Sequence, residues 1–386
     1  MPLLCFVAGD PSGDAHAARL IEALRTRDPT VTATGLGGPA MARAGATLLA
    51  DLTDAAAIGP FDALRHLGAL RRAKRLLEDH LRAQRPDLAI LVDFGDFNLP
   101  IIAPLIKRHG VPILYYISPQ VWAWGRFRLR YIRRYIDRMM VLFKFEEQFY
   151  QREGVPVTWV GHPLVDAARP TRSCEEARQH FGLNPWRRTV GLLPGSRERE
   201  IARHLPLMLQ AAARIVWRMP GVQFLLLKAP TVRRDVFERA LAVADADVCL
   251  AEGPAADALQ LMEAACVASG TATLETALRG VPMAVVYKTS WPTYLTARAV
   301  VRTPHIAMVN VVAGRALVPE FVQHRATPKR IAQTMVELLR DEERTTTMQA
   351  GLRAVAERLG PPGAVERAAD VVLEQIGALK TRPCPS

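Results

Sequence analysis

The stretch from Val190 to Glu200 has the residue types and spacing of a phosphate site. It reads V-G-L-L-P-G-S-R-E-R-E, an apolar run followed by a Pro-Gly turn and a polar helix start. Gly195 accepts backbone angles that other residues avoid, and the N–H groups from Ser196 onward would point from a helix N-terminus toward an anion. Arg197 adds a planar cation suited to phosphate oxygens. An ordinary strand-to-helix turn with a solvated arginine has the same pattern.

A second stretch, Val267 to Glu275, resembles the first in design. It reads V-A-S-G-T-A-T-L-E and places small and hydroxyl residues at another expected helix start, namely Ser269, Gly270, Thr271, Ala272 and Thr273. Glu275 follows one turn later, where a carboxylate can accept hydrogen bonds from sugar hydroxyls. A lone Ser-Gly-Thr turn also caps helices for structural reasons. The two stretches together predict one nucleotide site.

Two aspartates, Asp93 and Asp96, follow an expected buried strand and are candidates for acid–base chemistry. Transfer of a sugar from a nucleotide needs a carboxylate as general base on the acceptor hydroxyl, with cations or amides on the departing diphosphate. We predict Asp96 as this base. The alternative for either aspartate is a helix cap or a turn former. Asp245 and Asp247 have the D-x-D form of some metal sites but precede a strand, so we expect neither a bound metal nor a cofactor.

Apolar runs separated by helix-length segments predict the elements that position these residues. Such continuous runs are typical of parallel sheets covered on both faces. The expected strands are 3–8, 88–92, 111–117, 139–143 and 157–160, and then 189–193, 222–227, 248–251, 264–268 and 281–287. A helix is expected at 14–24, glycine-rich loops at 9–14 and 35–39, and helices from 327 to about 380 with a break at 360–363. The fold class is therefore α/β, with two Rossmann-like doubly wound domains facing across a cleft. We expect an N-terminal domain at 1–170, a C-terminal domain at 171–380 and a tail at 381–386.

Composition limits the class of protein and its partners. The 386 residues are 49% hydrophobic and 23% charged, which is typical of a globular protein. The five cysteines are scattered, so we expect reduced thiols in a cytoplasm, and we expect neither a signal peptide nor a membrane span. The net charge of +12 indicates an anionic partner.

Part of the positive charge is clustered beside apolar side chains. Trp122 and Trp124 precede six arginines between 126 and 138, and a leucine-rich basic stretch spans 64–85. A cluster of this kind is compatible with nucleic acid, with an anionic lipid surface, or with a solvated helix face whose aromatic residues pack inward. These residues alone leave the three interpretations open.

Eight motifs in order closely resemble the lipid-A-disaccharide synthases, over about residues 3 to 375. They are A-G-D-P-S-G-D at 8–14, G-L-G-G-P-A-M at 35–41, D-F-N at 96–98, I-S-P-Q-V-W-A-W at 117–124, G-H-P at 161–163, L-P-G-S-R at 193–197, S-G-T-A-T-L-E at 269–275 and V-P-E at 318–320. The first loop departs from the family pattern at Asp10, which stands where a glutamate is usual. A second departure is Val309, which stands where a proline is usual before Asn310.

The resemblance implies a glycosyltransferase of the GT-B type that acts without a bound metal. It would transfer the sugar of UDP-2,3-diacylglucosamine, with inversion, to the 6-hydroxyl of 2,3-diacylglucosamine 1-phosphate, at the cytoplasmic face of the inner membrane of Gram-negative bacteria. On the same grounds we expect an anionic lipid surface, contacted by 64–81 and 122–138, no nucleic acid, and a possible homodimer. Asp96 would be the base, and Arg197 would be needed for activity. The resemblance adds Asn310, Glu320 and Gln323 near the UDP site formed by Gly195, Ser196, Arg197, Ser269 to Thr273 and Glu275. The acceptor side would include Ser12, Gly13, Asp14, Asn98 and Trp122.

Another UDP-hexosamine enzyme of the same architecture is the main alternative, either a lipid-linked N-acetylglucosaminyltransferase or a UDP-N-acetylglucosamine epimerase. Only the first interpretation requires an acylated donor sugar. A nucleic-acid-binding protein is the alternative from another class, and its binding would fall steeply with salt.

Overall fold

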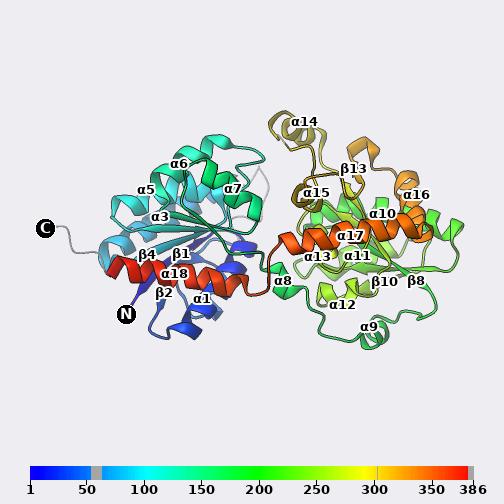
Figure 1. The fold of residues 1–386 in the computed structure, drawn as a ribbon, viewed down its shortest axis with the longest axis horizontal. Helices are drawn as coiled ribbons and strands as arrows, with labels where there is room; N and C mark the ends of the chain where they lie inside the picture. The colour runs from blue at the N-terminus through cyan, green and yellow to red at the C-terminus, as the bar shows by residue number, and fades with distance from the viewer. Residues whose placement is uncertain (54–62, 302, 381–386) are drawn as a thin grey trace. The chain divides into compact units, whose positions relative to one another are not determined.

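The computed structural model describes residues 1–53, 63–301 and 303–380, and the expected tail at 381–386 lies outside them. The chain forms two compact units (Figure 1). The first contains Met1–Pro163 and the chain from Pro361 onward, and the second contains Leu164–Gly360. This division differs from the expected one at the boundary, which lies seven residues earlier than 170, and in the last helix, which belongs to the first unit.

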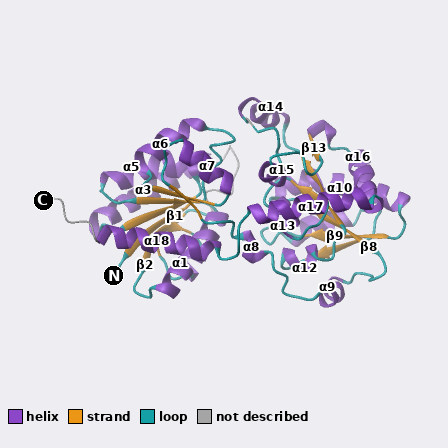
Figure 2. Ribbon diagram, in the orientation of Figure 1, coloured by secondary structure: helices purple, strands orange, loops and turns teal. Residues whose placement is uncertain are grey.

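Within the described residues, seven parallel strands form the sheet of the first unit, in the order β3-β2-β1-β4-β5-β6-β7. Helices cover the sheet (Figure 2). The strands are β1 Leu3–Ala8, β2 Thr32–Gly37, β3 Thr47–Asp51, β4 Leu88–Val92, β5 Ile113–Tyr116, β6 Arg138–Val141 and β7 Val157–Trp159. The helices are α1 Pro11–Arg27, α2 Pro39–Arg43, α3 Ala63–Gln84, α4 Gly95–Phe97, a π-helical turn Asn98–Ile102, α5 Ala103–Arg108, a 3₁₀ turn Arg126–Arg128, α6 Leu129–Tyr135, α7 Lys144–Arg152 and α18 Ala364–Lys380.

The second unit repeats this plan with six parallel strands among the described residues, in the order β10-β9-β8-β11-β12-β13. The strands are β8 Arg188–Leu193, β9 Val222–Leu227, β10 Val248–Ala251, β11 Ala264–Ala268, β12 Met283–Tyr287 and β13 Glu320–Val322. The helices are α8 Leu164–Ala167, α9 Cys174–Phe181, α10 Glu198–Arg218, α11 Arg234–Leu241, α12 Ala255–Leu259, α13 Ala272–Leu278, α14 Trp291–Val300, α15 Met308–Ala313, a 3₁₀ turn Gln323–Arg325, α16 Pro328–Arg340 and α17 Glu342–Arg358.

The reversal of strand order in each sheet determines where ligands can enter. In the first unit the order reverses between β1 and β4, and in the second between β8 and β11. At such a point the loops after the two neighbouring strands diverge to opposite faces, and this leaves a crevice at the carboxyl ends of the strands. The loops at 9–14, 93–98, 194–197 and 269–275 follow these four strands, whereas Trp122 lies after β5.

The glycine-rich segment expected as a loop at 35–39 is partly a strand, and this corrects the sequence interpretation. Gly35 and Gly37 lie within β2, and only Gly38 caps α2. A Cβ at Gly35 would lie 1.9 Å from the carbonyl oxygen of Phe6, and its φ is +144°. The glycines let β2 pair closely with β1, which explains why the usual β-branched signal of a strand is weak here.

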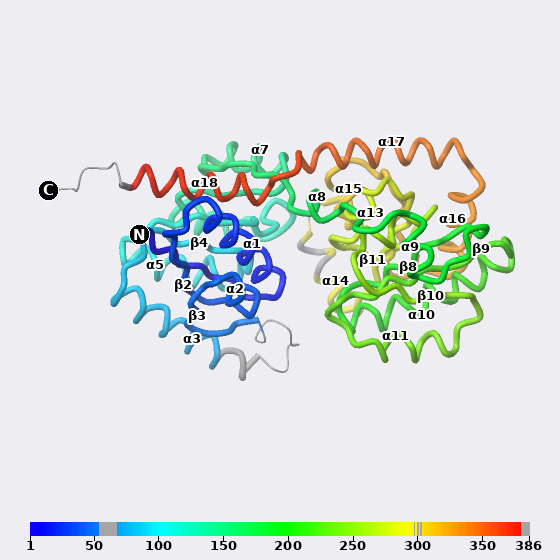
Figure 3. The backbone as a smooth tube through the Cα atoms, turned by 90° about the horizontal axis from the view of Figure 1, so that it is seen from below, coloured from blue at the N-terminus to red at the C-terminus, as the bar shows by residue number. Residues whose placement is uncertain are grey.

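Helix α18 runs beside α1 (Figure 3). Arg27 on α1 pairs with Asp370 at 3.0 Å, and Arg367 Nε donates to the carbonyl oxygen of Val160 at 2.8 Å. Ala368 and Val372 are fully buried in this packing. The apolar face of α18 therefore completes the first unit, even though it follows the second unit in the chain.

The leucine-rich basic stretch expected at a lipid surface packs inward in its described part. Ala73, Leu77 and Leu81 on α3 are 0–1% exposed and belong to the core of the first unit. The side chains of Leu64 and Leu67 lie outside the described residues. Leu77 and Leu81 were thus wrongly expected to face lipid, whereas Leu70 and Leu76 are half-buried. Among the described residues, no helix combines the length and apolarity needed to cross a bilayer.

We predict that Gly35→Ala destabilises the first unit by about 3 kcal/mol or more, because a side chain would meet the β1 backbone in a conformation that alanine resists. Denaturant unfolding followed by circular dichroism measures the change. Gly68→Ala, at an exposed helical site where an added Cβ meets nothing within 4 Å, is the matched control and should leave stability unchanged or slightly raised. Equal stability of the two variants would contradict the close β1–β2 packing.

Candidate active site

The loop after β4 has a strained backbone that neighbouring groups hold in place. Asp93 and Phe94 have φ values of +45° and +50°, which side chains other than glycine rarely adopt. The Asp93 N–H donates to the Tyr116 carbonyl at 3.0 Å, and the Asp93 carbonyl accepts hydrogen bonds from the Tyr115 hydroxyl and from Asn98 Nδ2 at 2.8 Å. Strained residues fixed from several sides are concentrated at functional sites.

Asp96 forms an ion pair with Arg128, and the two partners differ sharply in exposure. The Asp96 side chain is 76% exposed, whereas that of Arg128 is only 6% exposed. The Arg128 guanidinium also lies 4.1 Å from the ring centroid of Trp124. A buried cation held by an aromatic face therefore orients a carboxylate that solvent, or a substrate, can reach.

Asp93 has a different environment from Asp96. Burial raises the pKa of Asp93 to about 6, and the nearby negative charge of Asp10 acts in the same direction. Asp10 itself caps α1 by accepting the Gly13 N–H at 2.7 Å. The loop thus contains one exposed carboxylate paired with a cation and one buried carboxyl group whose pKa is raised.

The residues predicted on the acceptor side are brought to this edge of the first unit, with different degrees of access. Ser12 is exposed in the first turn of α1, next to the buried Gly13. The Asp14 carboxylate accepts backbone N–H groups of Gly38, Ala40 and Met41 at 2.8–3.1 Å, so it fixes the start of α2. Of these residues, Ser12 is the one whose side chain faces solvent.

Asn98 lies inside the protein, and Trp122 is half-buried. Asn98 is fully buried, and its Oδ1 has no hydrogen-bond partner among the described residues. Trp122 Nε1 donates to Glu146 at 3.1 Å. Burial raises the pKa of Glu146 to about 7, although its hydrogen bonds from the Phe143 N–H and Trp122 oppose the shift. These side chains support the loops after β4 and β5, and any contact with an acceptor remains a prediction.

The predicted phosphate loop after β8 has the expected form. Gly195 has φ of +119°, and α10 begins at Glu198 with Arg197 as its N-cap residue. Arg197 is 80% exposed and pairs with Glu200 at 2.9 Å, while Glu200 Oε2 accepts the Ser196 N–H at 3.3 Å. The carboxylate of Glu200 therefore lies where an anion can bind both the Ser196 N–H and the Arg197 guanidinium.

The loop after β11 leaves backbone donors available. Gly270 has φ of +152°, and the N–H groups of Gly270, Thr271 and Ala272 have no partner among the described residues. Ser269 Oγ donates to the Ile306 carbonyl at 3.0 Å, and Thr273 Oγ1 donates to Gly270 at 2.8 Å, so both hydroxyls brace the loop. Burial raises the pKa of Glu275 above its usual value.

The three residues that the resemblance adds, Asn310, Glu320 and Gln323, hold the neighbouring loops. Asn310 is fully buried, donates to Val318 and Glu320, and accepts from two backbone N–H groups, so all its polar capacity is used. Glu320 accepts the N–H groups of Ile306 and Ala307, each at 3.1 Å. Gln323, with φ of +50°, exchanges two hydrogen bonds with the backbone of Thr289. Direct contact of these residues with UDP stays a prediction.

A histidine that the sequence analysis did not single out joins two of these loops. His204 is 1% exposed, its Nδ1 lies 2.9 Å from the Pro194 carbonyl, and its Nε2 accepts the Lys288 N–H at 2.9 Å. These partners require a neutral ring with the proton on Nδ1. Burial lowers the pKa of His204, which is consistent with that state.

Arg128 was also missed as an individual residue. Arg128 is one of six arginines between 126 and 138, and the sequence analysis interpreted these together as a basic surface. Its contacts with Trp124 and Asp96 distinguish Arg128 from the other five, and both residues become its neighbours only on folding.

The D-x-D pair at Asp245 and Asp247 is not part of a metal-type cluster. Asp247 pairs with Arg187 at 2.5 Å, and the described residues contain no group of three side chains suited to a metal ion.

The comparison with protein families identifies the chain. A model described as lipid-A-disaccharide synthetase matches residues 4–373. The chain belongs to the lipid-A-disaccharide synthase family. The synthase of Geobacter sulfurreducens is 44% identical over 375 residues, which cover 97% of both chains. That of Syntrophus aciditrophicus is 43% identical and covers 97% of this chain and 98% of its own. The protein is thus a glycosyltransferase with UDP-sugar and acceptor substrates.

Solved structures support the fold of this family member. The UDP-GlcNAc 2-epimerase of Neisseria meningitidis, bound to UDP-GlcNAc, matches with a TM-score of 0.63 at 14% identity, covering 97% of this chain and 100% of its own. CalG4, the calicheamicin glycosyltransferase, matches with a TM-score of 0.60 at 16% identity, covering 100% of both chains. At these identities the likeness concerns the fold alone. It confirms the predicted architecture of two α/β domains, shared by GT-B glycosyltransferases and these epimerases.

We predict that Arg128→Lys lowers kcat by about 100-fold, because lysine keeps the charge but loses the planar group that stacks on Trp124 and orients Asp96. Steady-state kinetics would show the loss in kcat, with KM for the donor little changed. Arg130→Lys, at a neighbouring exposed arginine, is the control and should stay within twofold. Wild-type kcat in Arg128→Lys would refute an orienting role.

His204→Leu is predicted to weaken UDP binding about tenfold, because the Pro194 carbonyl and Lys288 N–H lose their shared partner. The substitution also tests a pH effect. Because the folded state lowers the pKa of His204, the unfolded state binds the proton more readily, so this residue makes stability fall as pH drops below about 6.5.

Calorimetry of UDP binding and thermal unfolding at pH 7.5 and 5.5 measure both effects. The variant should lose less stability than wild type on acidification. His180→Leu, at an exposed histidine of the same unit, should behave as wild type in UDP binding. Unchanged UDP affinity in His204→Leu would refute the link between the loops.

Proposed function

We propose that the protein transfers 2,3-diacylglucosamine from UDP-2,3-diacylglucosamine to the 6-hydroxyl of 2,3-diacylglucosamine 1-phosphate. The products are the β-1,6-linked disaccharide 1-phosphate and UDP. The observation that carries the proposal is the match to the synthase family over residues 4–373. Two features of the structure support it. The exposed carboxylate of Asp96 lies at the strand-order reversal of the first unit, and Arg197 and backbone N–H groups lie at that of the second.

Asp96 acts as the general base in this mechanism. Its exposed carboxylate accepts the proton of the acceptor 6-hydroxyl as that oxygen forms a bond to the anomeric carbon of the donor. Arg128 holds the carboxylate in position. Attack opposite to the departing diphosphate inverts the anomeric configuration, and the bond from the anomeric carbon to the phosphate oxygen breaks in the same step.

The second unit stabilises the charge that develops on UDP. Arg197 exchanges Glu200 for a phosphate oxygen, and the N–H groups of Gly270, Thr271 and Ala272 donate to the diphosphate. Glu275 accepts hydrogen bonds from the ribose hydroxyls. Because the N–H groups of Gly270, Thr271 and Ala272 are in place before reaction, they favour the leaving group without further reorganisation.

The acyl chains of both substrates place the reaction at a lipid surface. We infer that the protein binds peripherally to the cytoplasmic face of the inner membrane, with its net charge of +12 attracting anionic lipid. An epimerase is the alternative that the fold leaves open, and it differs in needing no acceptor and no lipid.

The proposal predicts UDP release that depends on both acylated substrates in mixed micelles. Asp96→Asn should lower kcat by about 1,000-fold with donor KM retained, since it removes only the base. Arg197→Ala should lower kcat/KM by about 100-fold or more, since it removes charge stabilisation of the diphosphate.

Asp79→Asn and Arg199→Ala, both at exposed positions, are matched controls and should retain wild-type rates. Release that ignores the acceptor, or full activity of Asp96→Asn, would contradict the proposed transfer.

A further inference from the structure

A long segment of the second unit contains no acidic residue. Between Glu275 and Glu320 the sequence has neither Asp nor Glu, although it includes five basic residues, Arg279, Lys288, Arg298, Arg302 and Arg315. Elsewhere in the described chain, surface arginines commonly pair with carboxylates, as in Arg233–Asp235 and Arg234–Glu238. A segment without internal counter-charges can satisfy its cations with an external anion.

The same segment carries a concentration of exposed apolar side chains. On α14, Trp291 and Leu295 are each 58% exposed, and after the helix Val301 and Ile306 are 37% and 39% exposed. Trp291, Leu295 and Arg298 are spaced i, i+4 and i+7, so they lie on one face of α14. Tyr294 packs edge-on against Trp291, with ring centroids 5.9 Å apart. The result is an aromatic and aliphatic face that ends in a cation.

This segment is attached to the predicted UDP loops. It follows β12 at the carboxyl edge of the sheet, where His204 holds Lys288 and Gln323 holds Thr289. A cavity of about 250 Å³ at the base of α14 is lined by Lys288, Trp291 and His324 among others. Ser269 Oγ reaches back to the Ile306 carbonyl. Figure 1 shows α14 at the margin of the second unit. Contact at α14 would therefore occur at the substrate edge of this unit.

We propose that α14, with Val301 and Ile306 after it, forms a docking surface for an anionic phospholipid bilayer. Trp291 and Leu295 enter the headgroup region, where tryptophan is favoured, and Arg298 and Lys288 pair with lipid phosphates. This assignment rests on the proposed function in that acylated substrates reside in such a bilayer. It differs from the expected contacts through α3, whose Leu77 and Leu81 lie in the core, and through 122–138, where Trp124 and Phe127 are exposed.

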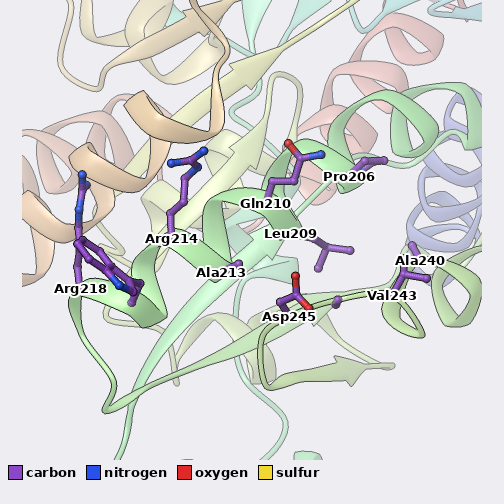
Figure 4. A pocket seen from close by; sticks show the side chains of 11 residues that line it. Pro206, Leu209, Gln210, Ala213, Arg214, Arg218, Ala240, Val243 and Asp245 are labelled. Atoms are coloured by element: carbon purple, nitrogen blue, oxygen red, sulfur yellow. The ribbon is translucent and has the colours of Figure 1, made fainter.

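A groove elsewhere in the second unit also exposes apolar side chains, but it lies away from the UDP loops and includes a carboxylate. It has a volume of about 640 Å³ between α10 and α11 and is lined by Leu209, Arg214, Trp217, Val243 and Asp245 among others (Figure 4). Trp217 and Val243 are 83% and 81% exposed. The groove lies beside the last turns of α10, which begins at the phosphate loop and ends before β9, so it is at the opposite edge of the sheet. A carboxylate, Asp245, also lines it. These features make it a matched comparison surface.

A second copy of the chain is a less suitable partner for the α14 surface. In a two-fold interface the same patch would face itself, and the cations of one patch would meet those of the other without a carboxylate between 276 and 319. A bilayer supplies both the anions and the apolar depth.

Co-sedimentation with vesicles of phosphatidylcholine and phosphatidylglycerol at a 7:3 ratio tests the proposal. We expect the double variant Trp291→Ser/Leu295→Ser to lose vesicle binding by about tenfold or more, because it removes the buried apolar area. Arg298→Glu should weaken binding to these vesicles and should have a smaller effect with pure phosphatidylcholine. Trp217→Ser/Val243→Ser in the α10–α11 groove should bind like wild type.

UDP binding, measured by calorimetry without lipid, separates this proposal from the proposed function. Variants on α14 should bind UDP as wild type does, which also shows that they are folded. Unchanged vesicle binding in the α14 double variant, or equal loss in the groove variant, would overturn the surface assignment while leaving the UDP site intact. A shift from dimer to monomer in the α14 variant, with vesicle binding retained, would overturn it in favour of a second copy.

Discussion

The reversal of strand order in each parallel sheet is the constraint on which the rest of the structure depends. It separates the loop after β1 from that after β4, and the loop after β8 from that after β11, so that each unit has one crevice with backbone amides and side chains at its edge. The chemistry is divided accordingly. The first unit offers carboxylates, and the second offers a guanidinium and N–H groups that have no partner in the described part of the chain. A group transfer needs both kinds of assistance, one for the attacking oxygen and one for the departing diphosphate.

Many polar residues near these crevices act on the loops themselves. Arg128 orients Asp96 from a buried position, and His204 links the loops after β8 and β12. The side-chain amide of Asn310 hydrogen-bonds to the chain around Val318. The strained backbone at Asp93 is likewise fixed by three hydrogen bonds. These internal hydrogen bonds hold the loops in place before a substrate arrives. The loops therefore need not reorganise during the reaction.

The sequence predicted those parts of the fold that depend on local pattern. The bounds of β1, β4, β9 and β11 agree with the buried apolar runs, because a strand covered on both faces needs little else. Those of β10 agree as well, although it is a half-buried edge strand. Strand β2 was missed because its glycines serve close contact with Phe6, and glycine ordinarily signals a loop. Helix α18 was assigned to the wrong unit because its partner, α1, is more than 300 residues away in the chain.

The candidate site follows the same rule. The turns around Gly195 and Gly270 were predicted because their chemistry is local, and both adopt positive φ values. Arg128 and His204 were missed because their partners come from distant segments. The basic aromatic cluster shows the limit most directly, since Trp122 and Arg128 bind Glu146 and Asp96 while Trp124 and Phe127 stay exposed, and a further exposed apolar face lies on α14. Burial distinguishes these cases, and it arises from tertiary packing.

A crystal structure of the protein with UDP would test the central claim most directly. The account predicts the diphosphate at the N–H groups of Gly270 to Ala272, with Arg197 turned from Glu200 to a phosphate oxygen and the ribose at Glu275. UDP bound in the first unit, or in the α10–α11 groove with the loops after β8 and β11 empty, would contradict it.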